Sequence, residues 1–232
     1  TLLDTPGHVD FSSETERTLS VLDYAILVIS GLDGVQSHTL TLWKLLKLYN
    51  VPTFVFVTKM DFARKSREEI IENLNSELDG EFVDFGDEEA VSENMALCSE
   101  SLMEKYLSGE EIDEKEIAEA IKLRKIFPCF FGSGLKLDGI DKFIKALEEY
   151  TIQPEYPEVF GAKVFKISHD SQGVRLTHIK VTGGSVKVRE MIGDEKISGI
   201  RIYSGAKFTT ADEVGSGEIC ALTGLDKTHN GQ

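Results

Sequence analysis

The sequence predicts an α/β domain followed by a small all-β antiparallel barrel, and three observations support this fold class. In the first part, unbroken apolar runs at 25–29 and 53–57 alternate with amphipathic segments, which is typical of a parallel sheet covered on both faces. Two prolines near residue 155 then mark a linker. Beyond the linker, short alternating strands are separated by glycine-containing turns. We therefore expect domains at residues 1–155 and 158–232.

The elements of the first domain follow from the spacing of its apolar residues. A buried strand needs only a short apolar run, whereas a helix shows apolar residues three or four positions apart, as Leu40, Trp43 and Leu46 do. The expected elements are a helix from about Asp10 to Leu22, a strand over Ala25–Ile29, a helix from about Gln36 to Tyr49, strands over Thr53–Val57 and Phe127–Phe131, and a helix from about Ile140 to Tyr150.

Residues 62–125 interrupt this alternation and are typical of an inserted subdomain. Their pattern is mostly helical and charged, and the stretch from Glu68 to Glu119 is especially acidic. Residues 1–157 hold 15 Lys and Arg against 31 Asp and Glu, whereas residues 158–232 hold 10 against 9. The sequence therefore predicts a solvated, acidic, helical insertion in the first domain.

The second domain is predicted from five runs with short, regular spacing. Alternating apolar and polar residues in each run suit a strand with one face buried. The runs are Ala162–Ile167, Leu176–Val181, Ser185–Met191, Lys196–Ile202 and Glu218–Leu222.

Composition argues against several functional classes. The formal net charge of −15 is unsuited to a general nucleic-acid binder, because phosphate contacts need concentrated Lys and Arg. No apolar run approaches the length that spans a bilayer, and the first residues do not show the pattern of a secretory signal. The 3 cysteines are widely scattered, so we expect reduced thiols in a cytoplasmic protein without membrane association.

The pentapeptide Asp4, Thr5, Pro6, Gly7 and His8 follows a strand end and precedes a helix, at the sheet edge where α/β proteins bind ligands. A carboxylate there, on Asp4, can hold Mg²⁺ through water, and the Gly7 amide can reach a terminal phosphate. His8 would then lie beside the γ-phosphate and orient a water for in-line attack. The alternative is a plain strand-to-turn connection with a surface histidine.

The tetrapeptide Thr58, Lys59, Met60 and Asp61 ends the strand that begins at Thr53. A carboxylate at this edge can accept hydrogen bonds from N1 and the exocyclic amine of guanine, a donor pair that adenine lacks. The methylenes of Lys59 can cover one face of the base. Alone, such a tetrapeptide is a weak signal, because Lys and Asp after a strand commonly form only a solvated turn. One strand–helix–strand unit separates it from the pentapeptide, however, and this spacing predicts that both motifs lie at one sheet edge.

A third loop, from Gly132 to Lys136, follows the strand that ends at Phe131. Its tight turn at Ser133 and Gly134 offers backbone amides that could hold the guanine O6 oxygen. Without the other two motifs, this Gly-Ser-Gly stretch would be only a flexible loop.

Taken together, these motifs resemble elongation factor G and the tetracycline-resistance ribosomal protection proteins. DTPGHVDFSSETERTLSVLD, from Asp4 to Asp23, resembles their second switch, and ISGLDGVQSHT resembles the segment after it. Phe54–Asp61 is similar to their guanine-specificity strand, and Lys125–Lys136 to their final base-contacting loop. Residues 158–232, with RIYSGAKF and GEICALTGL, resemble their second domain. The likeness covers most of the chain and is weakest from Ala63 to Leu123.

The resemblance implies an α/β P-loop-type GTPase domain and a translation factor that binds and hydrolyses GTP on the ribosome. Asp4 would take part in Mg²⁺ coordination through water, Gly7 would contact the γ-phosphate, and His8 would be the catalytic histidine that the ribosome positions. Lys59 and Asp61 would hold the guanine of GTP or GDP.

Ser133 would help to hold the base, and the barrel would dock on the small ribosomal subunit. The partners would be ribosomal RNA and ribosomal proteins, and the protein would be a monomer.

The sequence departs from the family pattern at two residues and in one segment. Thr58 stands where Asn is usual and lacks the amide that contacts the base, so we expect weaker nucleotide binding; Gly134 stands where Ala is usual. GxxxxGK[ST], the pattern of a phosphate-binding loop, does not occur in the chain, and neither does the first switch. We expect both upstream of residue 1, so that the domain is N-terminally truncated and these residues alone bind GTP poorly.

Other functions remain open at this point. A ribosome-binding module with weak or lost hydrolysis would act by occupancy, and Thr58 is the sequence feature that supports it. A metabolic P-loop enzyme is disfavoured by the appended barrel. The sequence does not separate elongation from antibiotic resistance, because later domains decide between these roles.

Overall fold

The computed structural model describes residues 1–5 and 12–232, which divide into two compact units. We call Asp23–Gln153 the α/β unit, and Thr1–Leu22 together with Pro154–Gln232 the β-rich unit. The expected domain boundaries, 1–155 and 158–232, stay a prediction.

The α/β unit is built on a four-stranded sheet with the order β1-β2-β4-β3. All of its neighbouring strands pair in parallel. Their bounds are β1 Ala25–Ser30, β2 Thr53–Thr58, β3 Phe82–Asp84 and β4 Phe127–Phe131. Parallel strands need crossover connections, and α2, Ser37–Leu48, provides the one between β1 and β2. The expected α/β architecture is therefore confirmed.

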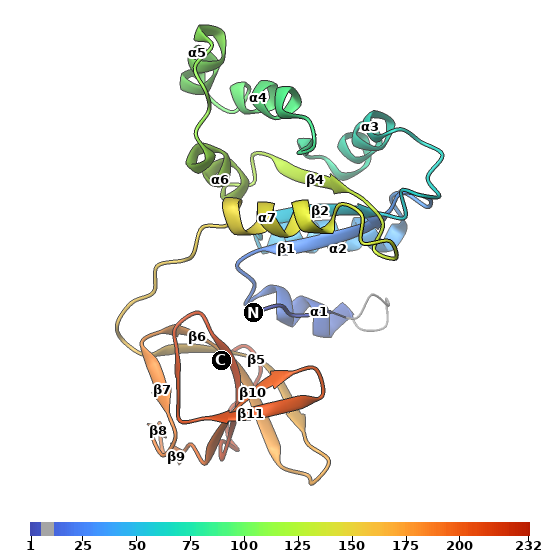
Figure 1. Ribbon diagram of the computed structural model, residues 1–232. Coiled ribbons are helices and arrows are strands. Elements are labelled where there is room, and N and C mark those ends of the chain that lie inside the picture. The colour runs from blue at the N-terminus through green and yellow to red at the C-terminus, as the bar shows by residue number, and fades with distance from the viewer. Residues whose placement is uncertain (6–11) are drawn as a thin grey trace. The chain divides into compact units, whose positions relative to one another are not determined.

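Helices pack on both faces of this sheet (Figure 1). Trp43 of α2 packs 4.7 Å from Phe127 of β4, measured between ring centroids. On the other face, Phe143 of α7, Ile140–Tyr150, lies 5.2 Å from Phe56 of β2 and equally close to Phe130 of β4. Apolar side chains are needed on both faces, which is why β2 and β4 read as unbroken apolar runs.

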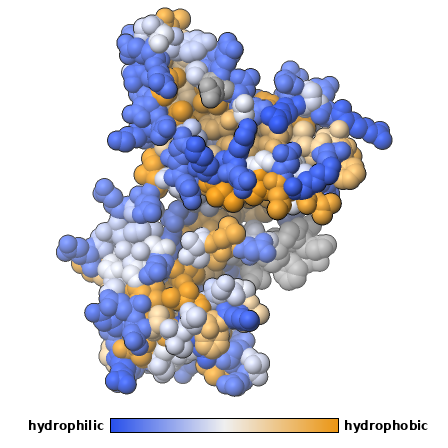
Figure 2. Space-filling view, viewed as in Figure 1, coloured by the Kyte–Doolittle hydropathy of each residue, from blue (hydrophilic) through white to orange (hydrophobic). Residues whose placement is uncertain are grey.

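Strand β1 lies at one edge of the sheet and is more open than its neighbours. Its burial alternates, with Ile26 37% and Val28 60% exposed, whereas residues Thr53–Val57 of β2 are buried throughout. Figure 2 shows a hydrophobic band along this side of the α/β unit. This edge keeps apolar surface that a further element could cover.

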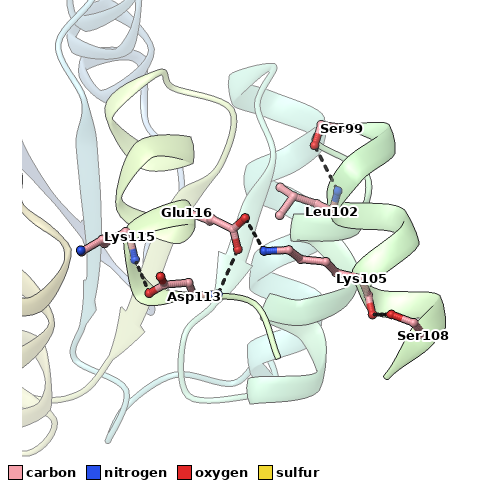
Figure 3. Close-up of polar contacts among 7 residues, drawn as sticks. All are labelled: Ser99, Leu102, Lys105, Ser108, Asp113, Lys115 and Glu116. Carbon is pink, nitrogen blue, oxygen red and sulfur yellow. Dashed lines mark hydrogen bonds and ion pairs between the residues drawn. The ribbon is translucent and has the colours of Figure 1, made fainter. Parts of the chain in front are cut away.

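The insertion contains four helices and the short strand β3. Helix α3, Arg67–Leu78, begins with a capping box in which Ser66 Oγ accepts from the amide of Glu69 at 3.3 Å. The others are α4 Glu88–Ala96, α5 Glu100–Ser108 and α6 Glu114–Lys122. Lys105 of α5 pairs with Glu116 of α6 at 2.7 Å (Figure 3). The helices expected in this stretch are present, the inserted subdomain stays a prediction, and β3 was not predicted.

The β-rich unit is mainly an antiparallel sheet with the order β11-β10-β13-β6-β5, accompanied by two two-stranded ladders, β12-β7 and β8-β9. Its strands are β5 Gly161–His169, β6 Arg175–Gly183, β7 Ser185–Lys187, β8 Met191–Ile192, β9 Glu195–Lys196, β10 Gly199–Ser204, β11 Lys207–Ala211, β12 Glu213–Gly215 and β13 Ile219–Thr223. Side chains from the sheet and from β7 and β12 share one core, to which Ile179, Val186 and Val214 belong. The antiparallel sheet is confirmed, whereas closure into a barrel stays a prediction.

Two of the five expected runs are divided in the structure. The run 185–191 gives β7 and β8, and the run 196–202 falls in β9 and β10. Helix α1, Ser12–Leu19, belongs to this unit, where Lys180 donates to the carbonyl of Val21 at 3.0 Å. Of the described helices, none combines the length and hydropathy that a membrane span requires.

Candidate functional site

The loops after β1, β2 and β4 meet at one edge of the parallel sheet. Strand pairing aligns Ser30 with Thr58, and Val57 with Phe131, so these three strands end level with one another. The ladder continues into the loops, because the amide of Gly31 donates to the carbonyl of Thr58 at 2.8 Å. This edge is the carboxyl end of the strands, where open α/β sheets bind ligands.

A second pair of backbone bonds joins the loop after β2 to the loop after β4. The Gly132 amide donates to the Val57 carbonyl, and the Met60 amide donates to the Gly132 carbonyl, both at 3.0 Å. The two predicted base-contacting loops therefore form one connected structure, which we call the guanine loops: residues 58–61 and 132–139.

The chain turns sharply at Lys59, whose φ is +59°. A non-glycine residue in the left-handed region costs about 1 kcal/mol, and the surrounding hydrogen bonds offset this cost. The turn is closed by the Phe62 amide, which donates to the Lys59 carbonyl at 3.0 Å. The left-handed turn thus follows directly on β2, in a conformation that strand propensity alone would not give.

Thr58 replaces the expected Asn and links the guanine loops through its side chain. The amide of Gly134 donates to Thr58 Oγ1 at 3.3 Å. The hydroxyl thus anchors the turn that contains Ser133 and Gly134. The residue that departs from the family pattern therefore still ties the two loops together.

Asp61 is the titratable group of this edge that the structure perturbs most clearly. Its carboxylate lies 3.2 Å from Nζ of Lys136, and the Asp61 side chain is 12% exposed. Desolvation alone would raise the pKa of Asp61, but the hydrogen bond and charge of Lys136, with a hydrogen bond to Ser133, outweigh it and hold the pKa below the usual range. The carboxylate is consequently ionised and able to accept hydrogen bonds at neutral pH.

The loop from Gly132 to Gly139 is a tight structure rather than a flexible linker. Ser133, only 3% exposed, exchanges two backbone hydrogen bonds of 3.1 Å with Asp138. A Cβ at Gly132 would lie 2.0 Å from the carbonyl oxygen of Asp138, so only glycine fits there. The structure therefore shows a hydrogen-bonded loop here and not the alternative, a flexible Gly-Ser-Gly stretch.

Two charged residues of this edge were not among the predicted site residues. Lys136 pairs with Asp61 as described, and Asp33, in the turn after β1, lies 3.8 Å from Nζ of Lys59. The signal for both was their position just after a strand of the same parallel sheet. Met60 plays a packing part, because its sulfur would lie 2.8 Å from a Cβ added at Gly31; its contact with a nucleotide stays a prediction.

The pentapeptide is described only in part. Asp4 is exposed and Thr5 is half-buried, and both belong to the β-rich unit. Residues 1–5 form no strand, so the strand end expected before the pentapeptide is not found. Pro6, Gly7 and His8 lie outside the described residues. The predicted proximity of the Asp4 and Asp61 carboxylates, and the roles of these five residues, stay predictions.

A magnesium ion held at Asp4 would need ligands beyond the described residues. Among the described residues, no group of three His, Cys, Asp or Glu side chains gathers as a metal cage would require. A single exposed carboxylate fits an ion that is bound through water and completed by nucleotide phosphates, which is how Mg²⁺ is commonly held.

A cavity of about 1180 Å³ in the α/β unit borders one end of the guanine loops. It is bordered by the insertion, β4 and α7, and Met95, Ile117 and Phe130 are among its lining residues. Of the guanine loops, Leu137, Asp138 and Gly139 line it, whereas none of the residues 58–61, 133 or 134 does. The guanine loops are therefore distinguished by their donors and acceptors, not by the size of a hollow.

Comparisons with known proteins agree with this chemistry. Residues 1–153 match the model of the elongation factor Tu GTP-binding domain. The chain is 29% identical to elongation factor G of Ureaplasma urealyticum serovar 10, covering 99% of this chain and 44% of that protein. It is 32% identical to the tetracycline resistance protein TetW of Butyrivibrio fibrisolvens, covering 95% of this chain and 38% of that protein. The chain thus spans less than half the length of these relatives.

A solved structure from Thermus thermophilus has the same fold. It superposes on 99% of this chain with a TM-score of 0.84, at 22% sequence identity, and the match covers 43% of its own length. This likeness supports the fold, and the family model covers well over half of the present chain. The protein belongs to the elongation factor Tu GTP-binding domain family.

Proposed function

We propose that this chain is the guanine-recognising part of a GTP-hydrolysing translation factor that acts on the ribosome. The observation that carries the proposal is the ionised, partly enclosed carboxylate of Asp61, presented by the guanine loops at the carboxyl edge of a parallel sheet. Membership of the family and the names of the relatives, an elongation factor G and a tetracycline resistance protein, support it.

In this proposal the base is read by a small set of groups. The Asp61 carboxylate accepts from N1 and the exocyclic amine of guanine, and the Lys59 stem covers one face of the ring. Amides of the turn at Ser133 and Gly134 hold O6. Adenine presents no such donor pair, so the site selects GTP and GDP over adenine nucleotides.

Hydrolysis would depend on the pentapeptide. His8 orients the attacking water, Gly7 contacts the γ-phosphate, and Asp4 holds Mg²⁺ through water. The ion, when bound, would neutralise charge that develops on the transferred phosphoryl group. His8 acts only when the ribosome positions it, which makes turnover dependent on the ribosome.

The phosphate end of the nucleotide would be held by residues outside these 232. GxxxxGK[ST] does not occur in the sequence, so the chain supplies no amide cradle of that kind for the α- and β-phosphates. We therefore expect the 232 residues alone to bind GTP weakly and to hydrolyse it negligibly. An upstream strand that goes with such a segment would pair with the open backbone edge of β1.

The β-rich unit would contact the small ribosomal subunit as a closed barrel. Residues 158–232 carry 10 Lys and Arg against 9 Asp and Glu, unlike the acidic first part. A hollow of about 460 Å³ in this unit is lined by Tyr203, Phe208 and Arg201, side chains on which unpaired bases can stack. The protein would work as a cytoplasmic monomer with ribosomal RNA and ribosomal proteins as partners.

The test is GTP turnover by the full-length protein, with and without ribosomes. Ribosomes should stimulate turnover strongly, and His8→Ala should abolish the stimulated part. The matched control is His229→Ala, which removes an exposed histidine of the β-rich unit and should leave turnover unchanged. Ribosome binding without any stimulated turnover would instead identify a module that acts by occupancy.

A further inference from the structure

A lysine outside the guanine-specificity tetrapeptide contacts the carboxylate on which base recognition depends. Lys136 reaches across from the loop after β4, and its Nζ lies 3.2 Å from Oδ2 of Asp61, at the end of β2. The inference below rests on the proposed function, because it concerns how the same site reads guanine.

The position of Lys136 is set by the loop that carries it. Its backbone amide donates to Ser133 Oγ at 3.4 Å. The backbone of Ser133 in turn forms hydrogen bonds with Asp138, and the Gly132 carbonyl accepts a hydrogen bond from the Met60 amide. The loop is therefore closed on itself and also fixed to the loop after β2. A side chain that starts from so constrained a backbone loses less conformational freedom when it forms an ion pair.

We propose that Lys136 is a positioning residue for guanine recognition, because it holds the Asp61 carboxylate ionised and oriented before the base arrives. A carboxylate has about four lone-pair sites, so an ammonium group at one of them leaves acceptor positions for the two donors of guanine. The Lys136 side chain is 64% exposed and can adjust as the base enters. Lys136 thus cooperates with the base instead of competing for the carboxylate.

The surrounding charges favour this assignment. From the β2 loop, Lys59 is directed to Asp33 of the β1 loop, at 3.8 Å. The β4 loop supplies Lys136 and the hydroxyl of Ser133. Lys136 is therefore the cation closest to Asp61 in the described ion pairs, and its removal would raise the pKa of Asp61 by leaving desolvation less opposed.

The experiment measures GDP and IDP affinity of the full-length protein between pH 4 and pH 8, for the wild type, Lys136→Met and Lys136→Arg. IDP lacks the exocyclic amine and so reports on the second hydrogen bond to Asp61. Lys44→Met is the control, because Lys44 is an exposed lysine on α2. Circular dichroism confirms that each variant is folded.

Lys136→Met should weaken GDP binding about tenfold at neutral pH and IDP binding less, because losing a charge-assisted contact costs about one order of magnitude in affinity. GDP affinity of this variant should also fall at a higher pH than in the wild type. The sign follows from protonation: with a raised pKa, more Asp61 is neutral at the acidic end of the range, and a neutral carboxyl is a poorer acceptor. Lys136→Arg should restore most of the affinity and the wild-type pH profile.

Three results would overturn the inference. Tighter GDP binding by Lys136→Met would make the lysine a competitor, and unchanged binding would leave it no part in recognition. An equal loss for GDP and IDP with an unmoved pH profile would indicate general loosening of the loop. A wild-type protein that binds no guanine nucleotide would instead refute the proposed function itself.

Discussion

The guanine loops and the insertion, both in the α/β unit, are stabilised in different ways. The loops are fixed to each other and to β1 by backbone hydrogen bonds between segments far apart in the sequence, such as Met60 to Gly132 at 3.0 Å. The insertion helices α4, α5 and α6 join the hydrophobic core through Met95, Leu102 and Ile117, and they begin with local side-chain caps. An ion pair between Lys105 and Glu116, whose side chains are 32% and 30% exposed, links α5 to α6. We therefore expect the guanine loops to tolerate less change than the surface of the insertion.

The largest effect should come from Asp61, to which we assign guanine selectivity. Asp61→Asn replaces one of two acceptor oxygens by a donor, so GDP affinity of the full-length protein should fall about 100-fold or more. XDP, whose base presents an acceptor in place of the amine, should then bind better than GDP. Calorimetric titration of both nucleotides checks this, and a variant that keeps its preference for GDP would refute the role of Asp61.

Glycine substitutions test the difference between the two regions directly. Gly132→Ala places a Cβ 2.0 Å from the Asp138 carbonyl oxygen and should destabilise the protein by about 2–4 kcal/mol. Gly109→Ala, at the end of α5, meets no atom within 4 Å and suffers only from its φ of +75°, so about 1 kcal/mol is expected. Urea denaturation measures both.

Equal losses at Gly132 and Gly109 would mean that the guanine loops are no more constrained than the insertion. A Gly132→Ala variant as stable as the wild type would contradict the close packing described for that loop.

Thr58 offers a milder test of the same loops. Thr58→Val removes the acceptor of the Gly134 amide, so the turn should loosen and GDP affinity should fall about three- to tenfold. Thr58→Ser keeps the hydroxyl and should retain most of the affinity. Fluorescent-nucleotide titration compares the two variants; identical behaviour would show that the hydroxyl does not set the loop.

The smallest effect is expected in the insertion. The hydrogen bond from Lys105 is the main cause that lowers the pKa of Glu116. The contribution of this pair to stability is therefore present above the usual glutamate pKa and is lost as the pH falls through the lowered one. Hydrogen exchange of α5 and α6 should quicken at low pH and in Glu116→Gln, while GDP affinity at neutral pH stays unchanged. A loss of nucleotide binding in this variant would couple the two regions.

The sequence predicted the strands of the parallel sheet that form unbroken apolar runs, although β1 is buried on one face only. Ala25–Ile29, Thr53–Val57 and Phe127–Phe131 read as apolar runs and became β1, β2 and β4. Strand β3 was missed because it has only 3 residues and pairs with a distant strand. Strand β11 was missed because residues 207–210 are exposed, so no alternation marks it.

The candidate site was predicted in part for a similar reason. The residue types of Thr58–Asp61 and Ser133–Gly134 carry recognisable chemistry, and the parallel sheet brings them together. The pairing of Lys136 with Asp61 depends on the path of a loop, for which the sequence has no periodic signal. Local motifs identify the side chains proposed to bind guanine, whereas tertiary contacts determine how those side chains are positioned.

A crystal structure of the full-length protein with GDP and Mg²⁺ tests the account most directly. We predict that the guanine lies over the Lys59 stem, with N1 and the exocyclic amine each within about 3 Å of an Asp61 oxygen, and that Asp4 reaches the ion through water. A nucleotide bound in the cavity beside Met95 and Phe130, with Asp61 facing only Lys136, would contradict it.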